Sequence, residues 1–475
     1  MDSIKVKEFN FLEFPPVSTE KWEAVISRDL KGKNYKEELL WSTLEGADIL
    51  PFYRSEDLDA LTHKTESVTG SADWHIIEKV DIPNLIKANK QALHSLENGA
   101  SGLLFDPPSS SINSKAELGQ LLKDVRVDFI SLHFGADLST QKIIDWLKEI
   151  CTENELDLKS LNITFSFDPF ARAVKSGKLA RKEDLVNYFK DKSPFKTFAV
   201  DADFYGNCGG GIVQQLAFSL AEGNEYLAMS DELNLEIPEV ASKIHFNFST
   251  ASAYFLEIAK YRAFRLVWAQ ILNAYENYLP DAANAFIHAK TASWNKTFSD
   301  AHNNIIRATT EAMSAALGGS NAITVERFDE DFAGHSEFSA RVARNIQLIL
   351  QGEAYLNKVS DAGAGSYYIE VLTDKFARES WKLFQEIEKH GGFYEAINTG
   401  FIQQQLSTSQ NKRIDAYQEN QSVLVGVNKY EVEKSQKPNS KSTTHSTRFP
   451  FDDFYEVDSV SELRIEHALK NGGQK

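Results

Sequence analysis

Three histidines, His133, His245 and His288, lie in short apolar runs that the pattern predicts as strands. A histidine that faces the inside of a domain can bind a metal or act as a general base, because its ring titrates near neutral pH. The sequence contains no HxH or HxxxH pair, and a buried histidine is more often held by hydrogen bonds alone. We therefore favour a structural role for these residues and predict no metal site.

Carboxylates follow several of the same runs, at Asp168, Asp201, Asp203 and Glu326. Asp201 and Asp203 are two residues apart, so they share a face if the strand continues through them. Paired carboxylates can carry acid–base chemistry. Solvated strand ends explain the same pattern more simply, and we favour that interpretation.

Residues 209–211 are three consecutive glycines between an apolar run and a helical pattern. Backbone N–H groups at such a helix start can bind a phosphate. No Lys-Ser/Thr pair follows, so this is not a Walker loop, and the absence of GxSxG excludes a hydrolase nucleophile elbow. A steric need for glycine in the turn is the favoured interpretation.

Arginines recur on the predicted helices, at Arg262, Arg265, Arg307, Arg341 and Arg344. Guanidinium groups bind phosphates in a bidentate manner, so these residues could hold a phosphate-bearing ligand such as a coenzyme A ester. Ion pairs on helix surfaces are the more common use of such residues.

Eight short apolar runs, each followed by a helical pattern, would position these side chains. They span residues 103–105, 127–133, 161–168, 197–204, 244–248, 285–289, 322–325 and 366–370. A spacing of roughly 25–50 residues is typical of strand–helix units in a parallel barrel. The sequence therefore predicts an α/β protein with a (β/α)8 TIM barrel, whose functional face lies at the C-terminal ends of the strands.

Helical periodicity predicts outer helices at 212–222, 253–274, 304–317, 339–350, 374–389 and 394–419. We divide the chain into an N-terminal extended arm at 1–90, the barrel at 91–395, a helix and a strand (423–427) packing on the barrel at 396–432, and a C-terminal extension at 433–475. That extension comprises a flexible linker, polar over 434–446, and a terminal helix. In the arm, residues 22–29 read as a helix capped at Ser18-Thr19.

The net charge of -17 argues against a nucleic-acid partner, which would need clustered basic residues. Cys151 and Cys208 form no CxxC motif, which suits a reducing compartment. No secretory signal or long apolar stretch is present, so the expected location is cytoplasmic, with no membrane partner.

Longer motifs resemble the adenosylcobalamin-dependent acyl-CoA mutases, specifically methylmalonyl-CoA mutase. FLEIAKYRAFR at 255–265 is similar to the FxEIAKxRAxR helix of the family, HNNIIR at 302–307 to YNNIxR, and EFSARVARNIQLILQ at 337–351 to EFSARIARNTQLILQ. QLAFSLAEGNEY at 215–226 and DAGAGSYYIE at 361–370 also resemble family segments. The matches run in order along most of the chain.

The resemblance implies a barrel that threads an acyl-CoA along its axis, and a smaller domain that holds cobalamin through the histidine of a DxHxxG loop. The cofactor then carries the radical rearrangement. Positions in the matching motifs are vestigial candidates for substrate binding. They are Arg262, Arg265, Asn303, Asn304, Arg307, Arg344 and Asn345.

The departures from the family pattern bear directly on catalysis. The sequence has no DxHxxG motif and nothing like RGPYATMY, so we expect no flavodoxin-like cobalamin-binding domain in this chain. Phe204 stands where the family has a substrate-contacting histidine, and Ser166 and Ser299 stand where it has glutamines. The resemblance therefore implies no catalytic residue here. A barrel that has lost its ligand must fill the space with side chains or stay wet.

We interpret the chain as the non-catalytic small subunit of such a mutase. The resemblance implies a heterodimer in which a catalytic large subunit binds adenosylcobalamin and interconverts methylmalonyl-CoA and succinyl-CoA. The N-terminal arm would wrap that partner. The alternative is a catalytic acyl-CoA mutase barrel that works with a cobalamin-binding domain on a separate chain.

Overall fold

Eight parallel strands form the centre of the computed structural model, which describes residues 15–61, 70, 72–106, 112–136, 139–190, 193–275, 285–330, 336–431 and 451–471. The strands are β3 (His75–Val80), β4 (Gly102–Phe105), β5 (Ser131–Phe134), β6 (Asn162–Phe165), β8 (Phe198–Asp201), β9 (Ile244–Thr250), β10 (Phe286–Thr291) and β11 (Ala322–Thr324). Their order is β6-β5-β4-β3-β11-β10-β9-β8. Lys196 bonds to the backbone of β6 and closes the ring. The predicted (β/α)8 barrel is confirmed.

The first observed strand, β3, was not predicted, and the last predicted strand is not a strand. Strand β3 lies within the range 1–90 that we assigned to the arm, because its charged residues Glu78 and Lys79 interrupt the apolar run. Residues 366–370 are not a strand: they fall at the start of helix α15 (Tyr367–Lys389). Their aromatic and β-branched side chains favour a strand locally, but burial of Ile369 against the barrel helices places them in a helix.

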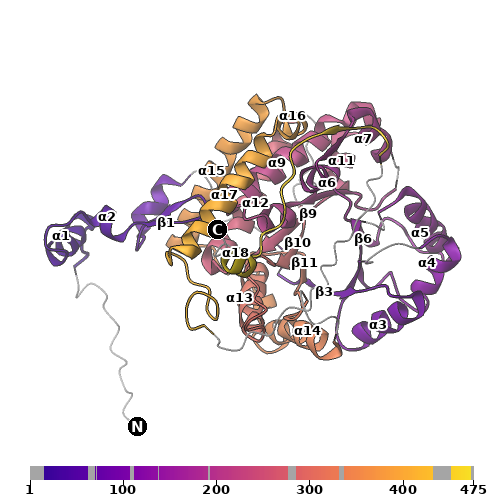
Figure 1. The fold of residues 1–475 in the computed structure, drawn as a ribbon, viewed down its shortest axis with the longest axis horizontal. Helices are drawn as coiled ribbons and strands as arrows, with labels where there is room; N and C mark the ends of the chain where they lie inside the picture. Colours follow the sequence, from indigo (N-terminus) through magenta and orange to yellow (C-terminus); the bar gives the residue numbers. More distant parts are fainter. Residues whose placement is uncertain are drawn as a thin grey trace, which may run out of the picture.

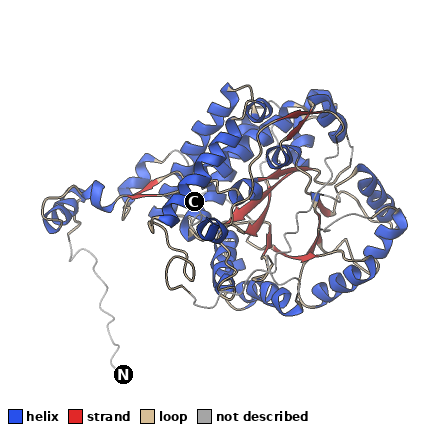
Figure 2. Cartoon of the chain, in the orientation of Figure 1, coloured by secondary structure: helices blue, strands red, loops and turns tan. Residues whose placement is uncertain are grey.

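Helices surround the barrel on its outside (Figures 1 and 2). They include α3 (Leu85–Glu97), α4 (Lys115–Leu121), α5 (Gln141–Glu153), α6 (Pro169–Ser176), α9 (Ile212–Ala228), α12 (Tyr254–Asn273), α13 (Asn303–Leu317) and α14 (Glu337–Gly352). The predicted helices at 212–222, 253–274, 304–317 and 339–350 are confirmed. Side-chain caps mark the starts of α3, α4, α5 and α14. Asn84, Ser114, Thr140 and Ser336 each accept a hydrogen bond from a backbone N–H in the first turn of these helices.

The apolar core lies between the strands and the helices rather than along the barrel axis. On β9, Phe246 and Phe248 point outward and their rings lie 4.5 and 5.0 Å from that of Phe264 on α12. Successive strand residues face opposite sides, so the alternate residues of β9 face the lumen. The lumen is consequently lined by polar side chains on this strand.

The N-terminal arm projects from the barrel, at the left of Figure 1. It contains α1 (Thr19–Asp29), α2 (Tyr35–Leu39), the hairpin β1 (Trp41–Ser42) and β2 (Asp48–Ile49), and the 3-10 helix η2 (Ser55–Ala60). The predicted helix at 22–29 is confirmed, with Ser18 as its N-cap. No residue of α1 is buried, so the arm has little core of its own.

After the barrel, α15 is followed by α16 (Phe393–Asn398) and α17 (Phe401–Gln418), as the helical prediction for 394–419 requires. The predicted strand at 423–427 is wrong. Residues 424–428 form a turn, because the side chain of Asn428 bonds to the backbone of Leu424, Tyr417 and Ser422. The predicted linker at 434–446 lies outside the described residues.

The last described residues, 451–471, form a segment that we call the C-terminal strap. It contains β12 (Phe454–Glu456), which pairs antiparallel with β7 (Lys178–Ala180), and the predicted terminal helix, α18 (Ile465–Asn471). Among the described residues, no helix is both long and apolar enough to cross a membrane.

Candidate functional site

Charged side chains occupy the C-terminal mouth of the barrel. Lys79 at the end of β3 lies 3.1 Å from Glu330 and 3.4 Å from Asp106. Arg327, just after β11, lies 2.6 Å from Glu330 and 2.9 Å from Asp81. Each cation therefore contacts two carboxylates, and the three strands β3, β4 and β11 are joined at this end by ion pairs of the chain itself.

The pKa values agree with this pairing. Burial acts to lower the pKa of Lys79, but Glu326 and the neighbouring carboxylates raise it well above its ordinary value. Burial acts to raise the pKa of Glu330, but Lys79 and Arg327 lower it to about 2. These groups stay charged near neutral pH, so the mouth carries fixed ion pairs rather than a free acid or base.

Asp201 and Asp203 lie near a third cation, Lys290 of β10, which is 3.5 Å from Asp203. The predicted placement of both carboxylates on one strand is wrong, because the chain enters α8 (Ala202–Asn207) directly after Asp201. Burial raises the pKa of each carboxyl to about 6, although Lys290 opposes the shift. The pKa values of the two carboxyl groups lie near neutrality, as acid–base chemistry would require. The cation beside them is Lys290 of the same chain, so their pairing does not by itself indicate a ligand.

Two lumen histidines meet across the barrel axis. His133 shares hydrogen bonds with Ser131 (2.8 Å) and Thr164 (2.7 Å), and His288 shares one with Thr324 (2.8 Å). Their ring centroids are 4.6 Å apart. Strands β5 and β10 lie four positions apart in the ring of eight, so the rings come from opposite walls. Both rings are held by hydrogen bonds, as the favoured interpretation predicts.

Burial lowers the pKa of both histidines well below the ordinary value, and it lowers that of His245 to about 3. All three rings are therefore neutral at pH 7. Within the described residues, no group of three or more histidine, cysteine, aspartate or glutamate side chains is arranged to hold a metal ion.

The three positions that depart from the family pattern lie in different surroundings. Phe204 is buried in α8, and its ring lies 5.7 Å from the Lys175 ammonium. Ser166 follows β6 and its N–H donates to Phe134. The hydroxyl of Ser299 contacts Glu466 and Lys470 of α18. The hydrogen bonds of this side chain are therefore made with the C-terminal strap.

Arg262 links two of the motifs by which the chain resembles the mutases. Its guanidinium contacts Asp361 at 3.1 Å and Glu370 at 2.9 Å, and it donates to Thr373. Arg265 donates to the carbonyls of two turns, at residues 285 and 319. The hydrogen bonds and ion pairs of both side chains join other parts of the barrel, so the two arginines act as clamps between elements.

The remaining candidates are divided between α13 and α14. The amide of Asn304 bonds to Thr297 and to the carbonyl of residue 328, Asn303 bonds to Asp300, and Arg307 donates to the carbonyl of residue 425. Arg344 pairs with Glu78 at 2.6 Å, whereas Asn345 is exposed. The structure thus gathers the α13 residues but not the whole set, and their binding of substrate stays a prediction.

The three glycines at 209–211 precede α9, and an anion of the chain itself meets this helix start. The Ile212 N–H donates to the carboxylate of Glu45, which also pairs with Arg413 at 3.0 Å. A Cβ on Gly210 would lie 2.7 Å from a backbone oxygen, and one on Gly211 2.6 Å from another. The steric interpretation of these glycines is confirmed, and the hairpin of the arm supplies the anion.

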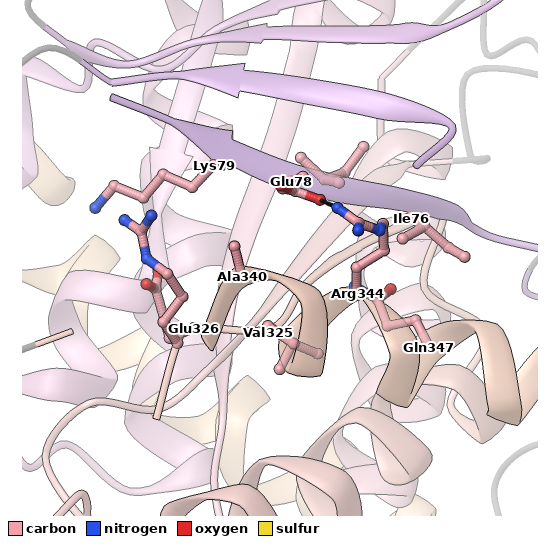
Figure 3. A pocket seen from close by; sticks show the side chains of 11 residues that line it. Ile76, Glu78, Lys79, Val325, Glu326, Ala340, Arg344 and Gln347 are labelled. Atoms are coloured by element: carbon pink, nitrogen blue, oxygen red, sulfur yellow. Dashed lines mark hydrogen bonds and ion pairs between the residues drawn. The ribbon is translucent and has the colours of Figure 1, made fainter. Parts of the chain in front are cut away.

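A small crevice lies between β3 and α14 (Figure 3). Ile76, Val325 and Ala340 line it, and the Glu78–Arg344 ion pair crosses it. Since Glu78 and Arg344 lie outside the barrel wall, the crevice separates a strand from its covering helix, and Lys79 and Glu326 also line it.

The C-terminal strap closes over the loops at the mouth. The N–H groups of Val460, Leu463 and Ile465 donate to carbonyls at residues 174, 207 and 294, which follow β6, β8 and β10. Glu462 pairs with Lys175 at 2.6 Å. Sequence analysis missed this role, although the spaced apolar residues 460, 463 and 465 in a polar tail were a usable signal.

These features define a TIM-barrel protein whose mouth and lumen are occupied by its own side chains. The family model described as methylmalonyl-CoA mutase matches residues 73–470, and the chain belongs to this family.

The chain is 35% identical to the methylmalonyl-CoA mutase small subunit of Porphyromonas gingivalis, over 90% of this chain and 72% of that protein. It is 28% identical to the small subunit of Propionibacterium freudenreichii subsp. shermanii, covering 84% of this chain and 66% of that one. It is also 28% identical to the methylmalonyl-CoA mutase of Rhizobium meliloti, covering 87% and 64%. The chain thus spans about two thirds of the length of the last two.

Among solved structures, wild-type HPPK-DHPS of Plasmodium falciparum with STZ-DHP aligns with 73% of this chain and 56% of its own length. The identity is 12% and the TM-score is 0.33, too low to indicate a common fold.

Replacing Arg262 tests whether it is a clamp. In Arg262→Met, Asp361 and Glu370 would lose the cation that balances their charges in a buried site, so we expect a loss of about 3 kcal/mol in the free energy of unfolding. Urea denaturation measures it, with the exposed Arg341→Met as control. A variant of unchanged stability that loses acyl-CoA binding would instead support the substrate-binding role.

The burial of His245 predicts that the folded protein loses stability in acid. Its folded pKa of about 3 lies below the ordinary value, so the unfolded chain binds more protons as pH falls, and stability is lost below about pH 6.5. One such group accounts for about 2 kcal/mol between pH 7 and pH 5. We expect His245→Asn to flatten the pH dependence of urea denaturation by this amount. His94→Asn, at a half-exposed site, serves as control; equal slopes in wild type and His245→Asn would contradict the assignment.

Proposed function

We propose that this chain is the non-catalytic small subunit of an adenosylcobalamin-dependent methylmalonyl-CoA mutase. The complex would be an isomerase that interconverts methylmalonyl-CoA and succinyl-CoA, and this chain would stabilise the catalytic large subunit. The observation that carries the proposal is the contact between His133 and His288 across the barrel axis, at 4.6 Å between ring centroids.

This contact conflicts with the use of the barrel that the family resemblance implies. A thioester threaded along the axis would have to pass between β5 and β10. The two rings fill that route, and hydrogen bonds to Ser131, Thr164 and Thr324 hold them there. Interiors are close-packed, so a ligand chain would have to displace both rings. The mouth ion pairs and the strap add a second obstruction.

The residues present do not fit adenosylcobalamin. When bound in a mutase, this cofactor supplies the radical that starts the rearrangement. His133, His245 and His288 are enclosed in the lumen at 0–1% exposure, and His75 is the first residue of β3, at the end of the barrel opposite the mouth, so none of the four presents a ring nitrogen to a planar group at the mouth. We therefore assign the cofactor to the partner subunit and derive no step through it here.

Relatives named small subunit and large subunit support a two-chain assembly. The arm offers a surface for it: Val17, Val25 and Trp41 are 52%, 46% and 53% exposed. Apolar and aromatic side chains in such numbers on a projecting element are typical of protein interfaces. We propose that the arm wraps the large subunit in a cytoplasmic heterodimer that has no nucleic-acid or membrane partner.

Reconstitution tests the assignment of function. The purified chain with adenosylcobalamin and methylmalonyl-CoA should form no succinyl-CoA. Co-expression with a large subunit of the family should give a stoichiometric, active complex. The alternative, a catalytic barrel served by a separate cobalamin-binding chain, predicts turnover when that chain is added, and loss of turnover in Lys79→Met at the mouth.

Truncating the apolar surface of the arm should weaken assembly. We expect Val25→Ser with Trp41→Ser to raise the Kd for the large subunit at least about tenfold, because each removes apolar area from the interface. Surface plasmon resonance measures this value. Phe129→Ser, which changes a 72% exposed residue beside β5, is the matched control. If the arm variant and Phe129→Ser changed the Kd equally, the arm would not be the surface that contacts the large subunit.

A further inference from the structure

Strand β9 presents three polar side chains to the lumen that lack hydrogen-bond partners. Phe246 and Phe248 face outward into the apolar core, so His245, Asn247 and Ser249 face inward. Each is at most 1% exposed. Within the described part of the chain, both ring nitrogens, both amide atoms and the hydroxyl oxygen of these residues have no partner.

A neighbouring carboxylate oxygen on β8 is in the same situation. Asp201 is paired in register with Asn247 across β8 and β9, and its Oδ1 is buried without a partner. A donor on one strand and an acceptor on the next therefore lie side by side without a direct bond. This arrangement requires a small molecule between them, because buried polar groups in folded proteins are almost always satisfied by protein or by water.

The surrounding side chains are not free to supply the bonds. His133 is held by Ser131 and Thr164, and His288 by Thr324. On β8, the residue in register with His245 is Ala199, whose methyl group occupies little of the lumen and offers no polar atom. On the β8–β9 side of the barrel, the small side chain of Ala199 thus lies beside donors and acceptors that have no hydrogen-bond partner.

The chemistry of this wall selects a small, neutral molecule. A neutral imidazole, a carboxamide and a hydroxyl each donate and accept. A charged ligand would have to lie beside Lys79, Lys290, Asp201 and Glu326, whose charges already oppose one another. The contact between His133 and His288 excludes a long molecule. Above, Gly206 of α8 lies against Ser249, where a Cβ would come within 2.0 Å of the hydroxyl.

We propose that the lumen beside β9 binds a line of ordered water molecules that joins His245, Asn247 and Ser249 to Asp201. Water satisfies each of these groups at the cost of little volume, and a buried molecule typically makes about three such bonds. The barrel is thus closed along its axis by two rings and remains hydrated along one wall.

The sign of a stability change tests this proposal. In a dry lumen, Asn247→Leu and Ser249→Ala would remove unsatisfied polar atoms, so each would raise the Tm or leave it unchanged, and their effects would add. In a hydrated lumen, each removes a bond to a shared water line, so each lowers the Tm and the two are non-additive. Ser314→Ala, which removes a buried hydroxyl bonded within α13, should be additive with both.

A second measurement detects the water directly and does not rest on a change in Tm. Oxygen-17 magnetic relaxation dispersion counts long-lived internal water, and the count should fall in Asn247→Leu. Raised Tm values with an unchanged count would overturn the proposal, as would mass-spectrometric detection of a small organic molecule released stoichiometrically on denaturation. None of these outcomes depends on the large subunit, so they are separate from the test of mutase function.

Discussion

The rest of the structure depends on how the inward-facing polar residues of the barrel obtain hydrogen-bond partners. Alternation along parallel strands sends the large apolar side chains to the helices and leaves histidine, serine, threonine and asparagine in the lumen. There the cost of an unpaired polar atom is high, since the surroundings offer little solvent. His133 and His288 meet this constraint by bonding to hydroxyls on neighbouring strands, and in doing so they close the axis.

The same constraint explains the charged residues. Arginine and lysine are rarely buried unless they are paired, and here Arg262, Lys79 and Arg327 each contact two carboxylates from different elements. The motifs shared with the mutases consequently act as clamps in this chain, because the atoms that could bind a phosphate already bind another helix or strand. A family signature can thus be retained for the fold it stabilises.

The chain also supplies its own groups wherever a ligand might have been received. Glu45 meets the start of α9, the C-terminal strap binds Ser299, and ion pairs join the ends of the strands at the mouth. The first two of these contacts come from segments remote in sequence, the arm and the tail, and the third joins strands of the barrel itself. The extensions therefore complete the barrel, and the exposed part of the arm is left for a partner.

The sequence by itself determined what depends on neighbours within a few residues. Helical periodicity located the outer helices α9, α12, α13 and α14, and the rhythm of apolar runs gave seven of the eight strands. The tertiary structure decided the rest. Strand β3 carries Glu78 and Lys79, which pair with Arg344 and Glu330 more than 200 residues away. Residues 366–370 are helical because Ile369 packs against the barrel helices. Asp203 lies in α8, because the chain leaves the strand after Asp201. Likewise, His133 and His288 could be recognised as strand residues, but their contact exists only once the ring closes, because it joins opposite walls of the barrel.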